Sequence, residues 1–129
     1  MVLEMHVIDT SFLVSFYLPA DENNPKALEM LERMASEQLV IPEYILYETL
    51  TVLNYKAGIE LCKSAHEELA NNSQVDIYHF DKHEQKEIID LFFKLKKISV
   101  ADASVVYLAE KLGCGVIAFD LQLHGLAKK

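Results

Sequence analysis

The stretch ISVADASVVYLAEKLGCGVIAFD, residues 98–120, holds a helix that is followed directly by a strand. Ser99, with Asp102 three residues later, is typical of a helix start, and Gly113 is typical of a helix end. The apolar run at 115–120 is short, like strands that are covered on both faces. A helix that leads into a buried strand favours a sheet of parallel strands.

The rest of the chain repeats this alternation. The predicted strands are residues 5–9, 38–41 and 75–80, and the predicted helices are residues 25–35, 42–58, 59–70 and one that Asp81 and Glu84 begin. Such an order predicts an α/β fold: three layers, α/β/α, around a mostly parallel sheet of four to five strands. Because no repeat or linker interrupts it, residues 1–129 are expected to form a single domain.

The composition excludes several classes of protein. Of 129 residues, 51% are hydrophobic, and only 4 Gly and 3 Pro occur, which fits a compact domain rather than a disordered chain. Glu4, His6 and Asp9 interrupt the first apolar stretch, and no run approaches the roughly 18 residues of a membrane span. We therefore expect a cytoplasmic protein with neither membrane segment nor cleaved signal peptide. Cys62, Cys114 and the five histidines lack ligand spacing, so neither a disulfide nor a zinc site is predicted.

The net charge of −8 at pH 7 is unusual for a nucleic-acid binder, because phosphates attract cations. Either the substrate is not a polyanion, or the acids gather where metal ions reverse their charge. Asp9 and Asp120 end the first and last predicted strands, and ligands bind beyond the carboxyl ends of parallel strands. Glu48 and Asp102 lie beside apolar helix faces, where an uncompensated carboxylate is costly. These positions favour the second alternative.

Carboxylates gathered at one place repel each other. Two charges about 5 Å apart cost roughly 3 kcal/mol at an effective dielectric constant near 20, and protons or a hard divalent cation relieve that repulsion. Oxygen ligands favour Mg²⁺ or Mn²⁺, and an ion held by carboxylates suits phosphodiester hydrolysis. Asp9, Glu48, Asp102 and Asp120 are therefore predicted as metal ligands and catalytic residues.

Each acid also has a purely structural interpretation. Asp9 is placed to cap a helix that begins near Ser11, and Asp120 to cap a C-terminal turn. Asp102 fits a capping box, and Glu48 fits a partly solvated helix rim. That all four acids serve only such roles is the less favoured interpretation.

Three stretches resemble the motifs of PIN domains, in the family's order: VIDTS at 7–11, IPEYILYETLTVLNYKAGI at 41–59, and the opening stretch at 98–120. The likeness covers nearly the whole chain and matches Asp9, Glu48, Asp102 and Asp120 to the motif acids. Within the family, the chain resembles VapC-type toxin ribonucleases and archaeal single-domain PIN proteins. The resemblance implies a Mg²⁺- or Mn²⁺-dependent endoribonuclease with RNA as substrate. It also implies a homodimer and an antitoxin protein as partner, as in toxin–antitoxin pairs.

The chain departs from the family pattern at two places. PIN domains commonly carry Thr or Ser two residues before the last acid, where this chain has Ala118, although Thr10 and Ser11 are placed to supply another hydroxyl. The closing strand of many members is expected to be absent or very short after Asp120. The missing hydroxyl leaves an alternative open: a PIN-like module that binds RNA or a partner protein without catalysis.

The predicted RNA contacts are Thr10, Ser11, Lys94, Lys96 and Lys97. The three lysines lie just before Asp102, and a solvated helix end favoured by the helix dipole is the alternative reading of them. Further candidate cations are Arg33, Lys56 and Lys82.

Other α/β classes fit less well. Asp9 is followed by Thr-Ser rather than by the x-D of phosphoaspartyl phosphatases, and it lacks the second acid of receiver domains. No GxxxxGK[ST] motif of P-loop nucleotide binders occurs.

Overall fold

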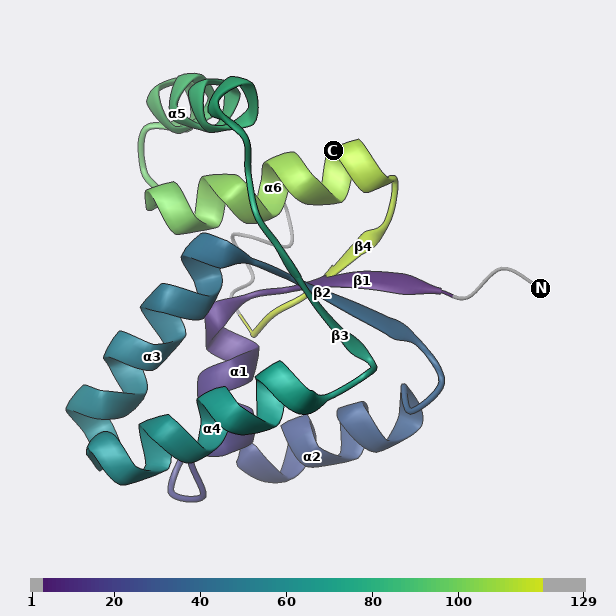
Figure 1. The fold of residues 1–129 in the computed structure, drawn as a ribbon, viewed down its shortest axis with the longest axis vertical. Helices are drawn as coiled ribbons and strands as arrows, with labels where there is room; N and C mark the ends of the chain where they lie inside the picture. The colour runs from purple at the N-terminus through teal and green to yellow at the C-terminus, as the bar shows by residue number, and fades with distance from the viewer. Residues whose placement is uncertain (1–3, 120–129) are drawn as a thin grey trace.

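The computed structural model describes residues 4–119, which form a parallel sheet between helices (Figure 1). The strands are β1 (Met5–Ile8), β2 (Gln38–Pro42), β3 (Val75–Tyr78) and β4 (Gly115–Ile117), in the spatial order β3-β2-β1-β4. All three strand pairings are parallel. The predicted α/β class is confirmed, with four strands in the described part of the chain.

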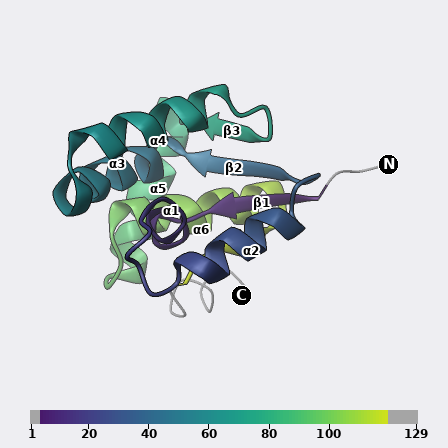
Figure 2. The ribbon, with the colours of Figure 1, turned by 90° about the horizontal axis from the view of Figure 1, so that it is seen from below.

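The helices alternate with the strands, as the sequence predicts. They are α1 (Thr10–Tyr17), α2 (Asn24–Arg33), α3 (Glu43–Ala57), α4 (Ile59–Asn71), α5 (Lys82–Leu95) and α6 (Val100–Leu112). Helices α5 and α6 lie on one side of the sheet and α1, α2 and α4 on the other, which gives the three layers (Figure 1). All strands run toward α3, which lies beyond their carboxyl ends (Figure 2). No helix within residues 4–119 is long and apolar enough to span a bilayer.

The core is formed where the two helical layers meet the sheet. Val7 at the centre of β1 pairs with Val40 in β2 and Val116 in β4, and it is fully buried. Ile45 of α3 and Leu108 of α6 are equally buried against this apolar centre. Coverage on both faces explains the continuous apolar run at 39–41 of β2, whose residues are all buried, whereas β3 keeps partial exposure.

Helix ends follow the local signals in the sequence. Asp81 with Glu84, and Ser99 with Asp102, form the two capping boxes that begin α5 and α6. Gly113 ends α6 in the left-handed region at φ 65°, a conformation that glycine adopts without steric cost.

Three predicted strands are longer than the observed ones. β1 ends at Ile8 because Asp9 already acts as the N-cap of α1, and β3 ends at Tyr78 because the chain turns there toward the cap of α5. β4 ends at Ile117, and the predicted strand residue Asp120 lies outside the described residues.

Candidate functional site

Asp9 lies where β1 passes into α1, at the carboxyl edge of the sheet. Its Oδ2 accepts hydrogen bonds from the backbone N–H of Ser11 at 3.1 Å and from the Ser11 hydroxyl at 2.9 Å. The Ser11 Oγ in turn accepts a bond from the Phe119 N–H, at 2.8 Å. The structural role foreseen for Asp9, a helix cap, is therefore real, but it uses only one of the two carboxylate oxygens.

The second oxygen of Asp9 has no hydrogen-bond partner in the part of the chain that the structure describes. Asp9 is 3% exposed, and its Oδ1 is buried and unpartnered among the described residues. Burial raises the pKa of Asp9 to about 6; the two Ser11 hydrogen bonds oppose the rise, and the negative charge of Asp102 adds to it. A buried carboxylate oxygen with no donor favours a proton or a cation.

Asp102 lies in the first turn of α6. Its backbone N–H donates to the Ser99 Oγ at 3.0 Å, and its Oδ2 accepts from the Ser99 N–H at 3.4 Å. The side chain is half-buried, and its charge is close enough to raise the pKa of Asp9. Asp102 thus caps its helix, as the structural interpretation predicts, and also belongs to the electrostatic surroundings of Asp9.

Glu48 reaches the same place from α3. Residues 48, 52 and 56 are spaced by four along this helix, so Glu48, Val52 and Lys56 lie on one face of it. That face borders an open hollow of about 530 Å³, which Asp9 and Asp102 also line. Three of the four predicted acids therefore border one shared hollow at the carboxyl edge of the sheet, although they come from three separate elements.

The fourth acid, Asp120, lies outside the described residues. Two predicted RNA contacts, Thr10 and Ser11, line the hollow with the acids. Thr10 is 7% exposed and its Oγ1 has no partner among residues 4–119.

The lysine cluster lies elsewhere. Lys94 lines a different hollow, of about 730 Å³, between α5 and α6. Lys96 is the C-cap of α5, and neither it nor Lys97 lines either hollow. The described structure therefore does not bring these three lysines to the acids, and their contact with RNA stays a prediction.

Sequence reasoning missed Asp21 and undervalued Lys56, which also line the acidic hollow. Asp21 lies between α1 and α2, where its Oδ1 accepts from the Ser15 hydroxyl at 2.8 Å and from the Asn23 N–H at 2.9 Å. No apolar helix face or strand end marks Asp21 in the sequence. The spacing of Lys56 from Glu48 was the one available signal for it.

The acids of the hollow are not drawn tightly together. Among the described His, Cys, Asp and Glu residues, the group whose ligand atoms all lie within 4.8 Å of one another is Glu4, His6 and Glu37, at the amino ends of β1 and β2. There His6 Nε2 lies 3.0 Å from Glu37 Oε1, an ordinary histidine–carboxylate pair. Asp9, Glu48 and Asp102 would thus hold an ion through side-chain movement or through intervening water.

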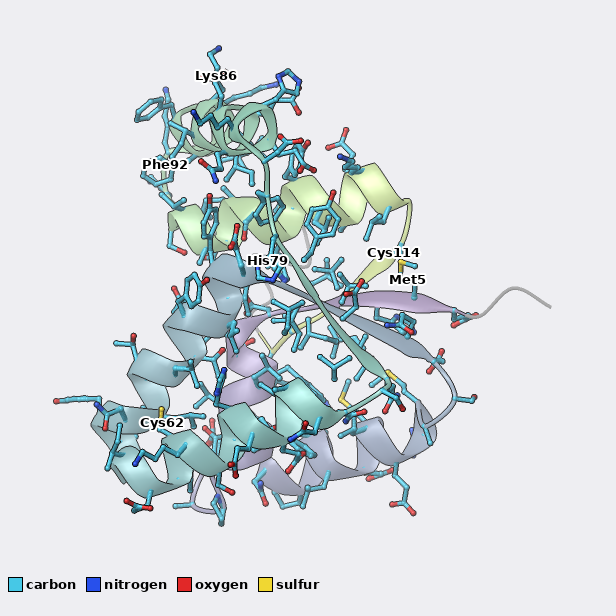
Figure 3. The ribbon with its side chains drawn as sticks, in the orientation of Figure 1. Met5, Cys62, His79, Lys86, Phe92 and Cys114 are labelled. Atoms are coloured by element: carbon cyan, nitrogen blue, oxygen red, sulfur yellow. The ribbon has the colours of Figure 1, made fainter. Side chains whose placement is uncertain are left out.

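Among the described lining residues of the acidic hollow there is no cysteine or histidine. Cys62 and Cys114 are free thiols, and they lie in distant parts of the molecule, with Cys114 next to Met5 (Figure 3). His79 pairs with Glu43 instead, at 3.1 Å. The donors at the hollow are oxygens, which fit Mg²⁺ or Mn²⁺, and the orphaned Oδ1 of Asp9 is the atom that such an ion would satisfy.

Solved structures share the fold over nearly the whole chain. The VapC20 toxin of Mycobacterium tuberculosis, described as cleaving the sarcin-ricin loop, has a TM-score of 0.83 at 20% identity, over 95% of this chain and 94% of that one. FitAcB from Neisseria gonorrhoeae has a TM-score of 0.69 at 17% identity, over 96% and 94%. VapBC2 from Rickettsia felis, bound to a promoter DNA fragment, has 0.67 at 14%, over 95% and 92%. At such identities the likeness concerns the fold alone.

The sequence itself identifies the family. No curated protein sequence matches the chain. The PIN domain model, however, matches residues 6–129, which include every motif quoted above. With its parallel sheet and an acidic hollow at the carboxyl edge, this chain belongs to the PIN domain family.

Proposed function

We propose that this protein is a Mg²⁺- or Mn²⁺-dependent endoribonuclease whose ion is held by Asp9, Glu48 and Asp102. The observation that carries the proposal is the buried Oδ1 of Asp9, which has no partner within residues 4–119, in a hollow that Glu48 and Asp102 share. Asp120 is proposed as the fourth acid, from its place in the last motif.

The protein's own residues would prepare the site for hydrolysis of a phosphodiester bond. The two bonds from Ser11 fix Oδ2 of Asp9, so that the carboxylate cannot rotate freely. The capping box fixes Asp102 in the same way at the start of α6. A bound divalent ion would supply Lewis-acid chemistry, lowering the pKa of water and offsetting phosphate charge. No histidine or lysine is then needed as a general base.

Ser11 also bears on the missing hydroxyl at position 118. Ala118 is 7% exposed and has no hydroxyl to offer, whereas the Ser11 Oγ bonds both to Asp9 and to the backbone of Phe119. We therefore propose that Ser11 supports the metal site in place of a hydroxyl at 118.

A toxin of a toxin–antitoxin pair is the proposed biological role, supported by the fold shared with the VapC20 toxin. Its partners would be RNA, an antitoxin protein and a second copy of the chain, in the cytoplasm. Several large apolar side chains are exposed on α3 to α5, which supports a protein partner: Tyr47, Tyr55, Ile59, Ile89 and Phe93. Sedimentation of the purified chain would test the homodimer, and a monomer at micromolar concentration would contradict it.

The experiment that tests the nuclease uses single-stranded RNA with and without Mn²⁺. The wild type is expected to cleave only with Mn²⁺. Asp9→Asn is expected to lose roughly a hundredfold or more in rate, because the loss of even an outer-shell partner of a metal ligand costs about 10–100-fold. Asp76→Asn is the matched control, because Asp76 is an exposed carboxylate on β3, outside the hollow. Equal cleavage by wild type and Asp9→Asn would overturn the mechanism.

One observation, Ala118, favours a second candidate: a PIN-like module that binds RNA or a partner without cutting. Calorimetry separates the two functions, because the nuclease needs the ion and the module does not. Failure of the wild type to bind Mn²⁺ would favour the module.

A further inference from the structure

We propose that Lys56 is the phosphate-binding residue of the acidic hollow and positions the RNA strand along α3. The inference rests on the proposed function, and it identifies where the polyanion enters a site that is otherwise lined with acids. Lys56 would contact a phosphate next to the scissile one, so it is a positioning residue and not a catalytic one.

The geometry of α3 supports this placement. Glu48 and Lys56 are eight residues apart, which is about 12 Å along a helix axis, and both line the hollow from one helix face. Side chains lean toward the N-terminus of their helix, so the lysine is directed back along α3 in the sense of Val52 and Glu48. A strand bound at the acids would therefore pass Lys56 before it leaves the hollow.

The charged side chains that line the hollow are mostly negative, so a lysine there would reduce the repulsion of RNA phosphates. The described lining residues include four carboxylates, those of Asp9, Asp21, Glu48 and Asp102, and Lys56 is the one Lys or Arg among them. A divalent ion would offset part of this negative charge, and RNA still brings one charge per phosphate. A cation at the rim would lower the remaining repulsion where the strand enters.

Lys56 is also available for such a contact. It is exposed, and no ion pair joins it to a carboxylate within residues 4–119. Two other lysines, by contrast, are held in ion pairs: Lys86 pairs with Asp90 at 3.6 Å, and Lys111 with Glu84 at 2.6 Å. A lysine left unpaired near several acids is suited to a ligand that carries its own negative charge.

The test compares Lys56→Ala and Lys56→Arg with Lys86→Ala. Lys86 is a matched exposed lysine that projects from α5, far from α3 (Figure 3). Binding of a fluorescent single-stranded RNA is measured in the Asp9→Asn background, so that cleavage is not required. Lys56→Ala is expected to weaken RNA binding about five- to tenfold. The slope of log affinity against log salt concentration should fall by roughly the share of one phosphate contact. Lys56→Arg is expected to retain most of the affinity, and Lys86→Ala all of it.

The same variants, with Asp9 intact, separate positioning from catalysis. Lys56→Ala is expected to raise KM about five- to tenfold with little change in kcat and in Mn²⁺ affinity. Unchanged RNA binding in Lys56→Ala would overturn the proposal. So would an unchanged KM with tighter Mn²⁺ binding, because Lys56 would then serve only to offset the acids. If RNA binding depends on Lys56 but the wild type never cleaves, the phosphate contact stands and the nuclease assignment fails.

Discussion

Asp9 serves as a helix cap and as a charge centre at once, and the two roles use different oxygens. Oδ2 is held by Ser11, and Oδ1 is buried with no partner among the described residues. A cap by itself would leave the second oxygen in water, where it costs nothing. The burial of Oδ1 is therefore the feature on which the proposed role of Asp9 as a metal ligand rests.

The raised pKa of Asp9 predicts how stability depends on pH without divalent ions. The carboxyl ionises near 3.8 in the unfolded chain and near about 6 in the folded one. The stability that the neutral form provides is thus present at low pH and lost as pH rises toward about 6, by up to about 3 kcal/mol. Asp9→Asn removes this loss, so its free energy of unfolding is expected to exceed that of the wild type by a larger margin at pH 8 than at pH 5.

Urea unfolding at the two pH values, with EDTA present, measures this difference. The same experiment on Asp76→Asn controls for the loss of one negative charge elsewhere. Identical pH dependence of wild type and Asp9→Asn would mean that Asp9 is not buried as described.

Ser11 and Thr10 are adjacent hydroxyl residues with opposite expected responses. Ser11→Ala leaves the Phe119 N–H without its acceptor and removes a bond to Asp9, so it should destabilise the fold by about 1–2 kcal/mol and raise the pKa of Asp9 further. Thr10→Val removes a hydroxyl that has no partner within the described residues, so the free energy of unfolding should change by about 0.5 kcal/mol or less. Urea unfolding measures both, and equal losses would contradict the hydrogen-bond assignment.

At the level of elements, an ion pair between the half-exposed Lys111 and the buried Glu84 joins α5 to α6. Glu84 is 5% exposed, and its Oε2 accepts hydrogen bonds from Lys111 Nζ at 2.6 Å and from the Tyr78 hydroxyl at 2.7 Å. Burial acts to raise the pKa of Glu84, but the bonds from Lys111 and Tyr78 outweigh it and hold the pKa below its ordinary value. Glu84, the capping-box partner of Asp81, thereby ties α5, α6 and β3 together.

Lys111→Met is expected to lower the free energy of unfolding by more than Lys86→Ala does, because the buried Glu84 carboxylate would lose its cation. Lys86→Ala, which removes the exposed pair with Asp90, should change it by about 0.5 kcal/mol or less. Chemical denaturation of both variants makes the comparison. A loss in Lys111→Met no larger than in Lys86→Ala would show that the pair contributes nothing to the packing of α5 on α6.

For the whole molecule, binding of an ion should raise the free energy of unfolding and the Tm. An ion that binds only the folded chain adds about 2.7 kcal/mol at a hundredfold excess over Kd, which is roughly 10 °C in Tm for a chain of this size. Mn²⁺ is expected to raise the Tm of the wild type by this order. Asp9→Asn should not show this rise in Tm, because the proposed ligands come together only in the folded chain and one of them is removed.

His6→Gln provides the control for this measurement, because Glu4, His6 and Glu37 form a second group of ligand atoms at the opposite edge of the sheet. The Mn²⁺-dependent gain should persist in His6→Gln. If His6→Gln lost the Mn²⁺-dependent rise in Tm while Asp9→Asn kept it, the ion would bind at the amino edge of the sheet, and the proposed site would be contradicted.

The sequence alone determined the order of strands and helices, the helix caps and the edge where the acids lie. These features depend on contacts a few residues apart, such as Ser99 with Asp102, or on the rule that parallel strands end at one edge. The prediction that Asp9, Glu48 and Asp102 gather could therefore be made from motif order and sheet direction.

Only the tertiary structure decided which other side chains join them. Lys56 and Asp21 reach the hollow because α3 and the turn after α1 converge on it, and Lys94 is turned instead toward the groove between α5 and α6. The bond from Phe119 to Ser11 and the pair of Lys111 with Glu84 likewise span long separations in the chain. Such contacts depend on how helices pack across the sheet, and no local pattern of residues encodes that geometry.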